Sequence, residues 1–334
     1  MALDVAYYYP APYWHGGEGD WIKSLLLFFD AVAILLPDYM YGRHAGADPT
    51  LVEPLEDQGL LQILNPNDWV DQTVTEELAS LIVELLTTGA FDDLPPDSYF
   101  TELSYSRMGY GADVELSTML VEELQAKNLA RPTEDGVSIP LHPVVRTTIL
   151  VLLAQLSRAA GERRGFTVHP ATNEYQAIHD LVCTLGRESF PSAGHVVTFD
   201  LEAVTLNLES VPLDDVLAFR ESEHRAHKTY MRNLRGFLSE VANADGSEAQ
   251  EVLLLERREE MADAAHDLRR IARRAFARTL GSWSLGLAGA AWSGAGGDLL
   301  SLALSGGSLA SGALPKPRST PTAFSYIFEA ARRF

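Results

Sequence analysis

The sequence predicts an α/β (or α+β) protein, with a small N-terminal layer built on a parallel-type sheet and a helical C-terminal region. Three observations support this prediction. Short aromatic or apolar runs alternate with amphipathic stretches over residues 1–90. Long, highly charged helical stretches follow from residue 211 onward. A segment rich in Gly, Ala, Ser and Leu, residues 279–315, then precedes the C-terminal helix pattern.

The composition is that of a folded protein with an acidic surface. Of the 334 residues, 46% are hydrophobic and 22% are charged, close to globular averages. The formal net charge of −20 disfavours nucleic acid as a partner, because a phosphate-backbone binder needs a basic face. The imbalance is greatest in residues 1–100, where 17 Asp and Glu residues face only Lys23 and Arg43.

Cysteine usage and the first residues indicate the cellular compartment. Cys183 is the only cysteine, so an intramolecular disulfide and a Cys-rich metal site are both excluded. The N-terminus lacks the basic and apolar stretches of a secretory signal. We therefore expect a cytoplasmic protein, peripheral to the membrane if its apolar segment meets lipid.

A strand, a helix and a strand follow one another at the N-terminus. Residues 5–10 are aromatic and β-prone and end at a proline, which predicts a strand. Residues 21–30 predict a helix with Asp20 as its N-cap, and residues 31–37 a buried strand. Such a βαβ unit implies parallel pairing. Further elements are expected as helices at 49–58 and 73–88 and a strand at 60–64.

An insert of helix, β-ribbon and helix is predicted at about 91–165. The helices are expected at 114–128 and 142–163, and a Gly-containing turn at 133–136 joins the arms of the ribbon. This order resembles part of a winged-helix module. The supposed recognition helix, however, has little basic character before Arg158.

The remaining patterns complete the predicted domains. Strands at 166–170 and 195–200, with a helix at 171–185 between them, are expected to extend the sheet. Residues 1–210 then form one acidic α/β region. In residues 211–334, helical stretches at 213–243 and 246–280 predict an antiparallel pair, followed by the apolar hairpin.

The best candidate polar site is the carboxyl edge of the predicted sheet, where open α/β folds place their ligands. His15, Asp20 and Asp38 are expected there, and Asp30 is a further candidate. Two carboxylates and a histidine could bind a divalent metal or act as acid and base. A helix cap and solvated side chains explain the same residues without a site. No common nucleotide, zinc-protease or serine-hydrolase motif occurs, and no cofactor is indicated.

Three other histidines are weaker candidates. His169 lies at a predicted strand end, beside Thr172 and Asn173, which are typical of a helix entry. His224 and His227 have a spacing that can chelate a metal, but the same spacing is ordinary on a charged, solvated helix.

The C-terminal segment predicts an interaction surface. Residues 279–315 form two apolar arms around Asp298, with Leu285 and Leu302 in the arms. Each arm is too short and too rich in Gly and Ser for a constitutive membrane anchor. We expect either a hairpin packed within protein or contact with an anionic membrane. A stripe of basic residues precedes it, at Arg269, Arg270, Arg273, Arg274 and Arg278.

Three segments resemble a family of bacterial proteins known as a domain of unknown function. The first is Tyr8-Tyr9-Pro10, followed by Asp20-Trp21-Ile22-Lys23 and by Asp30 and Pro37; the others are residues 212–225 and 323–328. The resemblance implies a bacterial cytosolic setting and an N-terminal α/β element tied to a helical C-terminus. It implies no catalytic residue.

The missing catalytic motifs and the Gly-rich segment favour a non-enzymatic interaction or effector protein of a bacterial assembly or defence-type system, such as phage defence. Its hairpin would mediate assembly, with a protein partner or a second copy, or inducible membrane contact. The alternative is an enzyme of unfamiliar type, with a metal- or nucleotide-dependent site at the N-terminal sheet edge.

Overall fold

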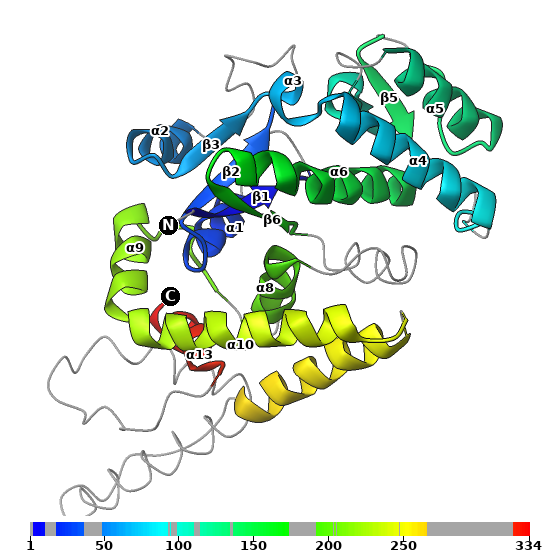
Figure 1. Ribbon diagram of the computed structural model, residues 1–334. Coiled ribbons are helices and arrows are strands. Elements are labelled where there is room, and N and C mark those ends of the chain that lie inside the picture. The colour runs from blue at the N-terminus through cyan, green and yellow to red at the C-terminus, as the bar shows by residue number, and fades with distance from the viewer. Residues whose placement is uncertain are drawn as a thin grey trace, which may run out of the picture.

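The fold is built on a four-stranded parallel sheet with helices on both faces, which confirms the predicted α/β class (Figure 1). The chain is represented by a computed structural model. It describes residues 3–10, 18–36, 49–92, 94, 99–109, 114–133, 136–173, 192–202, 204, 206–246, 248–265 and 323–334.

The strand order is β3-β2-β1-β6, and every neighbouring pair is parallel. Val5 of β1 lies opposite Ala31 of β2 on one side and Val168 of β6 on the other. The expected strands of the N-terminal third are thus present, and the strand at 166–170 joins the same sheet. The strands are β1 Leu3–Tyr8, β2 Ala31–Leu35, β3 Leu61–Leu64 and β6 Phe166–Ala171.

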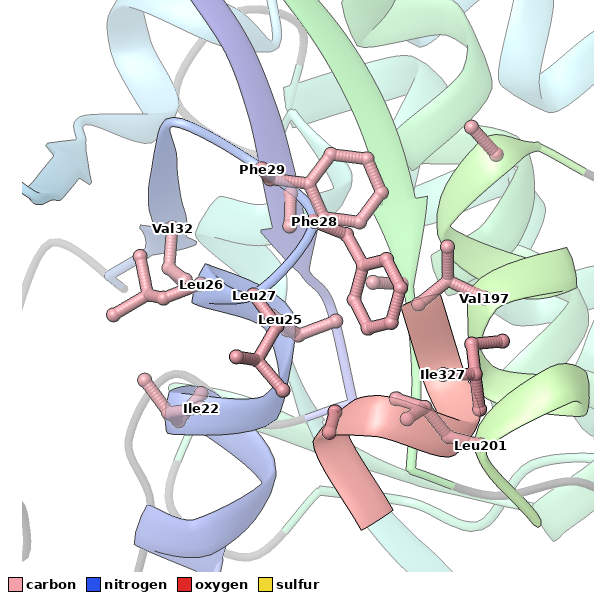
Figure 2. Close-up of a cluster of buried hydrophobic side chains, with 14 of the residues drawn as sticks. Ile22, Leu25, Leu26, Leu27, Phe28, Phe29, Val32, Val197, Leu201 and Ile327 are labelled. Carbon is pink, nitrogen blue, oxygen red and sulfur yellow. The ribbon is translucent and has the colours of Figure 1, made fainter. Parts of the chain in front are cut away.

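Side-chain alternation in β1 separates two hydrophobic cores. Ala6 and Tyr8 point to one face, and Val5, Tyr7 and Tyr9 point to the other. The first core holds the leucines of α1, both phenylalanines that follow them, and residues of α8 and the C-terminal helices (Figure 2). The helices of this face are α1 Glu18–Leu26, α2 Pro49–Asp57, α8 Ala193–Glu202, α9 Leu213–Ser222, α10 His224–Asn243 and α13 Ser325–Arg333.

The second face is covered by α6, Pro143–Arg163, which packs against β6 and α4. By length and composition α6 is the one helix among the described residues that could cross a membrane, yet most of it is buried inside the protein. The short helix α3, Pro66–Trp69, adds Trp69 to the same core.

The insert consists of helices α4 and α5, a 3₁₀ helix and a two-stranded antiparallel sheet. Its strands β4 and β5 are antiparallel, with Leu103 opposite Ile139, and Ala130 forms an isolated bridge to Leu141. The predicted ribbon is present, because the N–H groups of Arg131 and His142 donate to the carbonyls of Pro140 and Leu129, each at 2.9 Å, and β4 adds an unpredicted strand that pairs with β5. The helix α5 carries three glutamates and no lysine or arginine. The elements are α4 Gln72–Thr88, β4 Thr101–Ser104, the 3₁₀ helix η2 Tyr105–Met108, α5 Val114–Ala126 and β5 Ser138–Leu141.

An antiparallel helix pair forms the C-terminal region, as predicted. The helix at 248–265 runs back alongside α10 (Figure 1), and Arg257 donates to Asn233 across the pair at 3.1 Å. The expected single helix at 213–243 is interrupted, because α9 ends at Ser222 and α10 begins at His224. The apolar hairpin at 279–315 lies outside the described residues.

The strand expected at 195–200 is wrong, because these residues lie in α8. The run of Val196, Val197 and Thr198 is β-branched, which favours a strand on local grounds. In α8 every residue from Ala193 to Leu201 is buried, so no polar face marks the helical period. Tertiary packing decides the structure here: α8 lies between β6 and α10.

Candidate functional site

The carboxyl ends of β1 and β6 form the topological switch point of the sheet. From β1 the chain passes to β2 and β3 on one side, and it returns as β6 on the other side of β1. Open α/β sheets bind ligands at this position, outside the carboxyl ends of the strands where the strand order reverses. The residues at this edge are therefore the first place to look for a site.

Two arginines from the insert reach consecutive carbonyl groups at the end of β1. Arg107 in η2 donates from Nη2 to the carbonyl oxygen of Tyr9 at 2.7 Å. Arg146 in α6 donates from Nη2 to the carbonyl oxygen of Pro10 at 2.6 Å, and from Nε to that of Glu102 at 2.9 Å. These contacts fix the insert against the switch point and bring two positive charges to it.

Among the described residues, Arg107 is buried without a counter-charge. Its side chain belongs to a residue that is only 2% exposed, and none of the described carboxylates forms an ion pair with it. Its Nε has no hydrogen-bond partner among the residues that the structure describes. Burial raises the pKa of the nearby Tyr7 phenol, and the charge of Arg107 opposes that rise. A buried guanidinium of this kind is energetically unfavourable unless an anion compensates it.

His195 completes the cluster from the β6 side. Its Nδ1 accepts from the backbone N–H of Ser192 at 3.3 Å, so the ring proton is assigned to Nε2, which lies 3.0 Å from the Tyr9 hydroxyl. Burial lowers the pKa of His195 to about 3. The imidazole is therefore neutral at physiological pH and held by two partners, an arrangement that suits positioning of Tyr9 better than proton transfer.

Gly194 allows α8 to bring His195 to this place. A Cβ atom at Gly194 would lie 2.2 Å from the carbonyl oxygen of Pro170 in β6, so only glycine permits this approach. The preceding Ser192 accepts from the His195 backbone N–H at 3.2 Å, which is the contact of a helix N-cap, and its hydroxyl donates to Pro170.

The other end of α8 carries a buried ion pair. Arg257 donates from Nε and Nη2 to the two oxygens of Asp200 at 2.8 and 2.6 Å, and the Tyr230 hydroxyl donates to the same carboxyl group at 2.8 Å. Burial raises the pKa of Asp200, whereas these three donors act in the opposite direction. Burial lowers the pKa of the Arg257 guanidinium, but its hydrogen bonds to Asp200 and the charge of that carboxylate raise the pKa by more, so the net shift is upward. Because a guanidinium keeps its proton, we assign Asp200 as a carboxylate.

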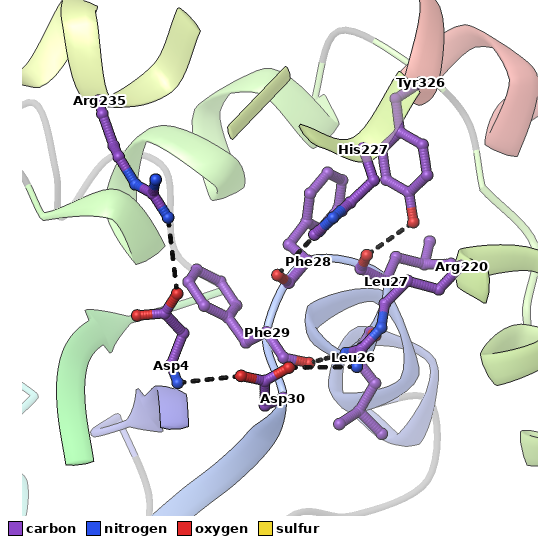
Figure 3. Close-up of polar contacts among 10 residues, drawn as sticks. All are labelled: Asp4, Leu26, Leu27, Phe28, Phe29, Asp30, Arg220, His227, Arg235 and Tyr326. Atoms are coloured by element: carbon purple, nitrogen blue, oxygen red, sulfur yellow. Dashed lines mark hydrogen bonds and ion pairs between the residues drawn. The ribbon is translucent and has the colours of Figure 1, made fainter. Parts of the chain in front are cut away.

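A separate polar network lies at the amino edge of the sheet, and it contains His169 (Figure 3 shows its centre). His169 Nε2 lies 3.1 Å from Asp4 Oδ1, a contact that is the main reason for the lowered pKa of Asp4. The backbone N–H of Asp4 donates to Asp30 at 3.1 Å, and Arg220 donates to Asp30 at 3.2 Å. His169, predicted at a strand end, lies within β6, and its side chain contacts Asp4 near the amino end of β1.

The C-terminal helices contact this network through Arg220, His227 and Tyr326. Arg220 donates to the carbonyls of Leu26 and Phe29, and Tyr326 donates to that of Leu27 at 2.6 Å (Figure 3). His227 contacts the carbonyl of Phe28 at 3.1 Å, and burial lowers its pKa. Asp30 and His227 therefore both make structural contacts, although the Asp30 side chain is also 38% exposed.

The other predicted site residues are only partly described. Asp20 lies inside α1 rather than at its N-cap; burial raises its carboxyl pKa, and Lys23 opposes the rise. His15 and Asp38 lie outside the described residues, as do the interaction candidates Arg269, Arg270, Arg273, Arg274, Arg278, Leu285, Asp298 and Leu302. Within the described ranges, no group of three or more His, Cys, Asp or Glu side chains could hold a metal ion.

Sequence reasoning did not identify Arg107, Arg146 or His195. The sequence does contain a signal for Arg107. No Lys or Arg occurs between Arg43 and Arg107, so this arginine is the first basic residue after a long acidic stretch. His195 gave no such signal, because its role depends on α8 being a helix.

The fold and the edge cluster define an open α/β protein with a helical C-terminal region and a cationic switch point. Comparison with protein-family models, curated proteins and solved structures finds no match for this chain. The resemblance drawn from short segments stays a prediction.

Proposed function

We propose that this chain is a non-enzymatic interaction or effector protein of a bacterial assembly or defence-type system, acting in the cytoplasm. In this proposal the helical C-terminal region presents the arginine stripe and the apolar segment 279–315 to a protein partner or a second copy, or to an anionic membrane on activation.

The observation that carries the proposal is the anchoring of the helix at 248–265. Arg257 in the middle of this helix is bound to Asp200 of α8, and its guanidinium lies over the rings of Phe237 and Phe324 at 4.5 and 5.1 Å. A binding segment loses less entropy on association when the element that leads into it is already fixed. The helix that leads toward residues 266–278 has such a fixed base.

The outer face of the same helix also favours contact with a partner. Val252 and Leu255 are 47% and 52% exposed and lie three residues apart, on one side of the helix. These two side chains leave an exposed apolar surface on the described part of the helix.

The proposal is tested with the full chain and a Leu285→Asp/Leu302→Asp double variant. Light scattering measures self-association, and flotation with vesicles of phosphatidylglycerol and phosphatidylcholine measures lipid contact. We expect the wild type to associate or to float, and the double variant to do neither. Met119→Asp, at an exposed apolar position on α5, is the matched control and should behave as wild type. A wild type that is monomeric and stays with the soluble fraction at every ionic strength would contradict the proposal.

The enzyme alternative keeps a distinct requirement. It needs His15, Asp20 and Asp38 together at the sheet edge, and it predicts a metal ion or nucleotide that co-purifies with the wild type and is lost in Asp20→Ala. His195 is neutral, and both of its ring nitrogens make hydrogen bonds. It therefore supplies the enzyme hypothesis with no acid–base group from α8.

A further inference from the structure

Two arginines are buried among the residues that the structure describes, and the difference between their partners points to a ligand. Arg257 and Arg107 are 3% and 2% exposed. Arg257 has a carboxylate, an amide oxygen and two aromatic rings as partners. Arg107 has the carbonyl oxygen of Tyr9 and the neighbouring phenol of Tyr7, but no described carboxylate, and its Nε–H is unused among the described residues.

We infer that Arg107 is the anchor of a binding site for a small oxyanion, the phosphate or carboxylate group of a small molecule, at the carboxyl end of β1. This inference concerns binding alone and does not depend on the proposed function.

The position of Arg107 supports a ligand rather than a purely structural role. It lies at the switch point of the sheet, against the last residues of β1, where open α/β folds receive ligands. Arg146 binds the next carbonyl along the chain and is half-buried, so the positive region continues from Arg107 toward solvent.

The surrounding groups select an anion. Two guanidinium groups disfavour a cation, and oxyanions match the donor geometry of a guanidinium. The phenol of Tyr7 is protonated at neutral pH, as phenols ordinarily are, and a protonated phenol can donate to an anion. The net charge of −20 repels anions in general, so measurable anion binding would report a specific site.

The test measures binding of inorganic phosphate and of succinate to the full chain by equilibrium dialysis, with chloride at matched ionic strength as reference. The melting temperature is followed in the same series, because a ligand that binds only the folded state raises it. We expect saturable binding of one of the two probes; phosphate and succinate distinguish the phosphate from the carboxylate source. Absence of binding of both probes to the wild type overturns the inference.

Variants locate the site. Arg107→Gln should weaken binding by about tenfold or more, since a hydrogen bond to a charged group contributes roughly 1.5–3 kcal/mol. Arg163→Gln, which removes an exposed arginine paired with Asp71, is the matched control and should bind as wild type. If Arg107→Gln does not fold, Arg107→Lys keeps the charge but removes the Nε donor and should still bind more weakly. Equal binding by the folded Arg107 variant and the wild type overturns the inference.

Discussion

Arg257 and Asp200 form a buried ion pair with two hydrogen bonds, which joins the antiparallel helix pair to α8. Their side chains are 2% and 0% exposed. Tyr230 of α10 donates to the same carboxylate. One acidic side chain thus joins three helices, and α8 in turn packs on β6 of the central sheet. The pair therefore connects the helix pair to α8, in addition to the contacts that Arg220 makes with the turn after α1.

Asp200→Asn should destabilise the protein by about 3–5 kcal/mol, because Arg257 keeps its charge but loses the carboxylate that compensates it. A double variant, Asp200→Leu/Arg257→Met, removes both charges and should recover most of this loss. Urea denaturation measures both values. A loss below about 1 kcal/mol for Asp200→Asn would show that the pair is not the connection described above.

His195 makes stability depend on pH below neutrality. Its pKa is about 3 when folded, against 6.5 in the unfolded chain, so the unfolded state binds an extra proton between these values. Its contribution to stability is complete above pH 6.5 and is lost as pH falls toward 3, at about 1.4 kcal/mol per pH unit. The stability difference between wild type and His195→Gln should therefore shrink as pH falls from 6.5 to 4.5. Met119→Gln, at an exposed position on α5 that carries no titratable group, should show a constant difference.

Two glycine substitutions should have opposite effects. Gly194→Ala places a Cβ 2.2 Å from the Pro170 carbonyl oxygen, and this overpacking between α8 and β6 should cost about 1–3 kcal/mol. Gly236→Ala on α10 meets no atom within 4 Å, so it should stabilise by about 0.5–1 kcal/mol through helix propensity. Melting temperatures of the two variants decide the comparison. A neutral Gly194→Ala would mean that α8 is not held this closely to β6.

Arg220→Lys tests the connection between α9 and the turn that follows α1. Arg220 serves the carbonyls of Leu26 and Phe29 and the carboxylate of Asp30 at once, and one ammonium group cannot reproduce that fork. We expect a loss of about 1–2 kcal/mol in the free energy of unfolding. Arg232→Lys, at an exposed position on α10, should change it by less than about 0.5 kcal/mol. Equal effects of the two variants would count against the proposed connection.

The sheet and the amphipathic helices were predictable because their signals are local. The strands at 31–35 and 61–64 are short apolar runs between helical patterns, and α4 shows a clear apolar stripe. The elements that were missed have no local signal. The helix α8 is buried on all sides, and β4 is a four-residue strand whose partner lies beyond α5.

The candidate site was predictable in position but not in composition. The carboxyl edge follows from parallel pairing alone, and the structure places a polar cluster there. Its residues come from η2, α6 and α8, which are distant in sequence from β1 and reach it only through tertiary packing. Conversely, Asp30 was a further candidate for that edge and His169 was predicted at a strand end, whereas both make their contacts near the amino ends of the strands.

The pairing of β1 with β6 has a consequence for how the chain is made. One of the two strands that flank residues 3–8 in the sheet is formed by residues 166–171, and the turn after α1 is contacted by Tyr326. During synthesis, neither of the two hydrophobic cores that flank β1 can be completed until most of the protein has been made. Leu27 and Phe28 would remain accessible to chaperones until the helix at 325–333 has left the ribosome, so a premature stop upstream of that helix should yield an aggregation-prone product rather than a shorter soluble one.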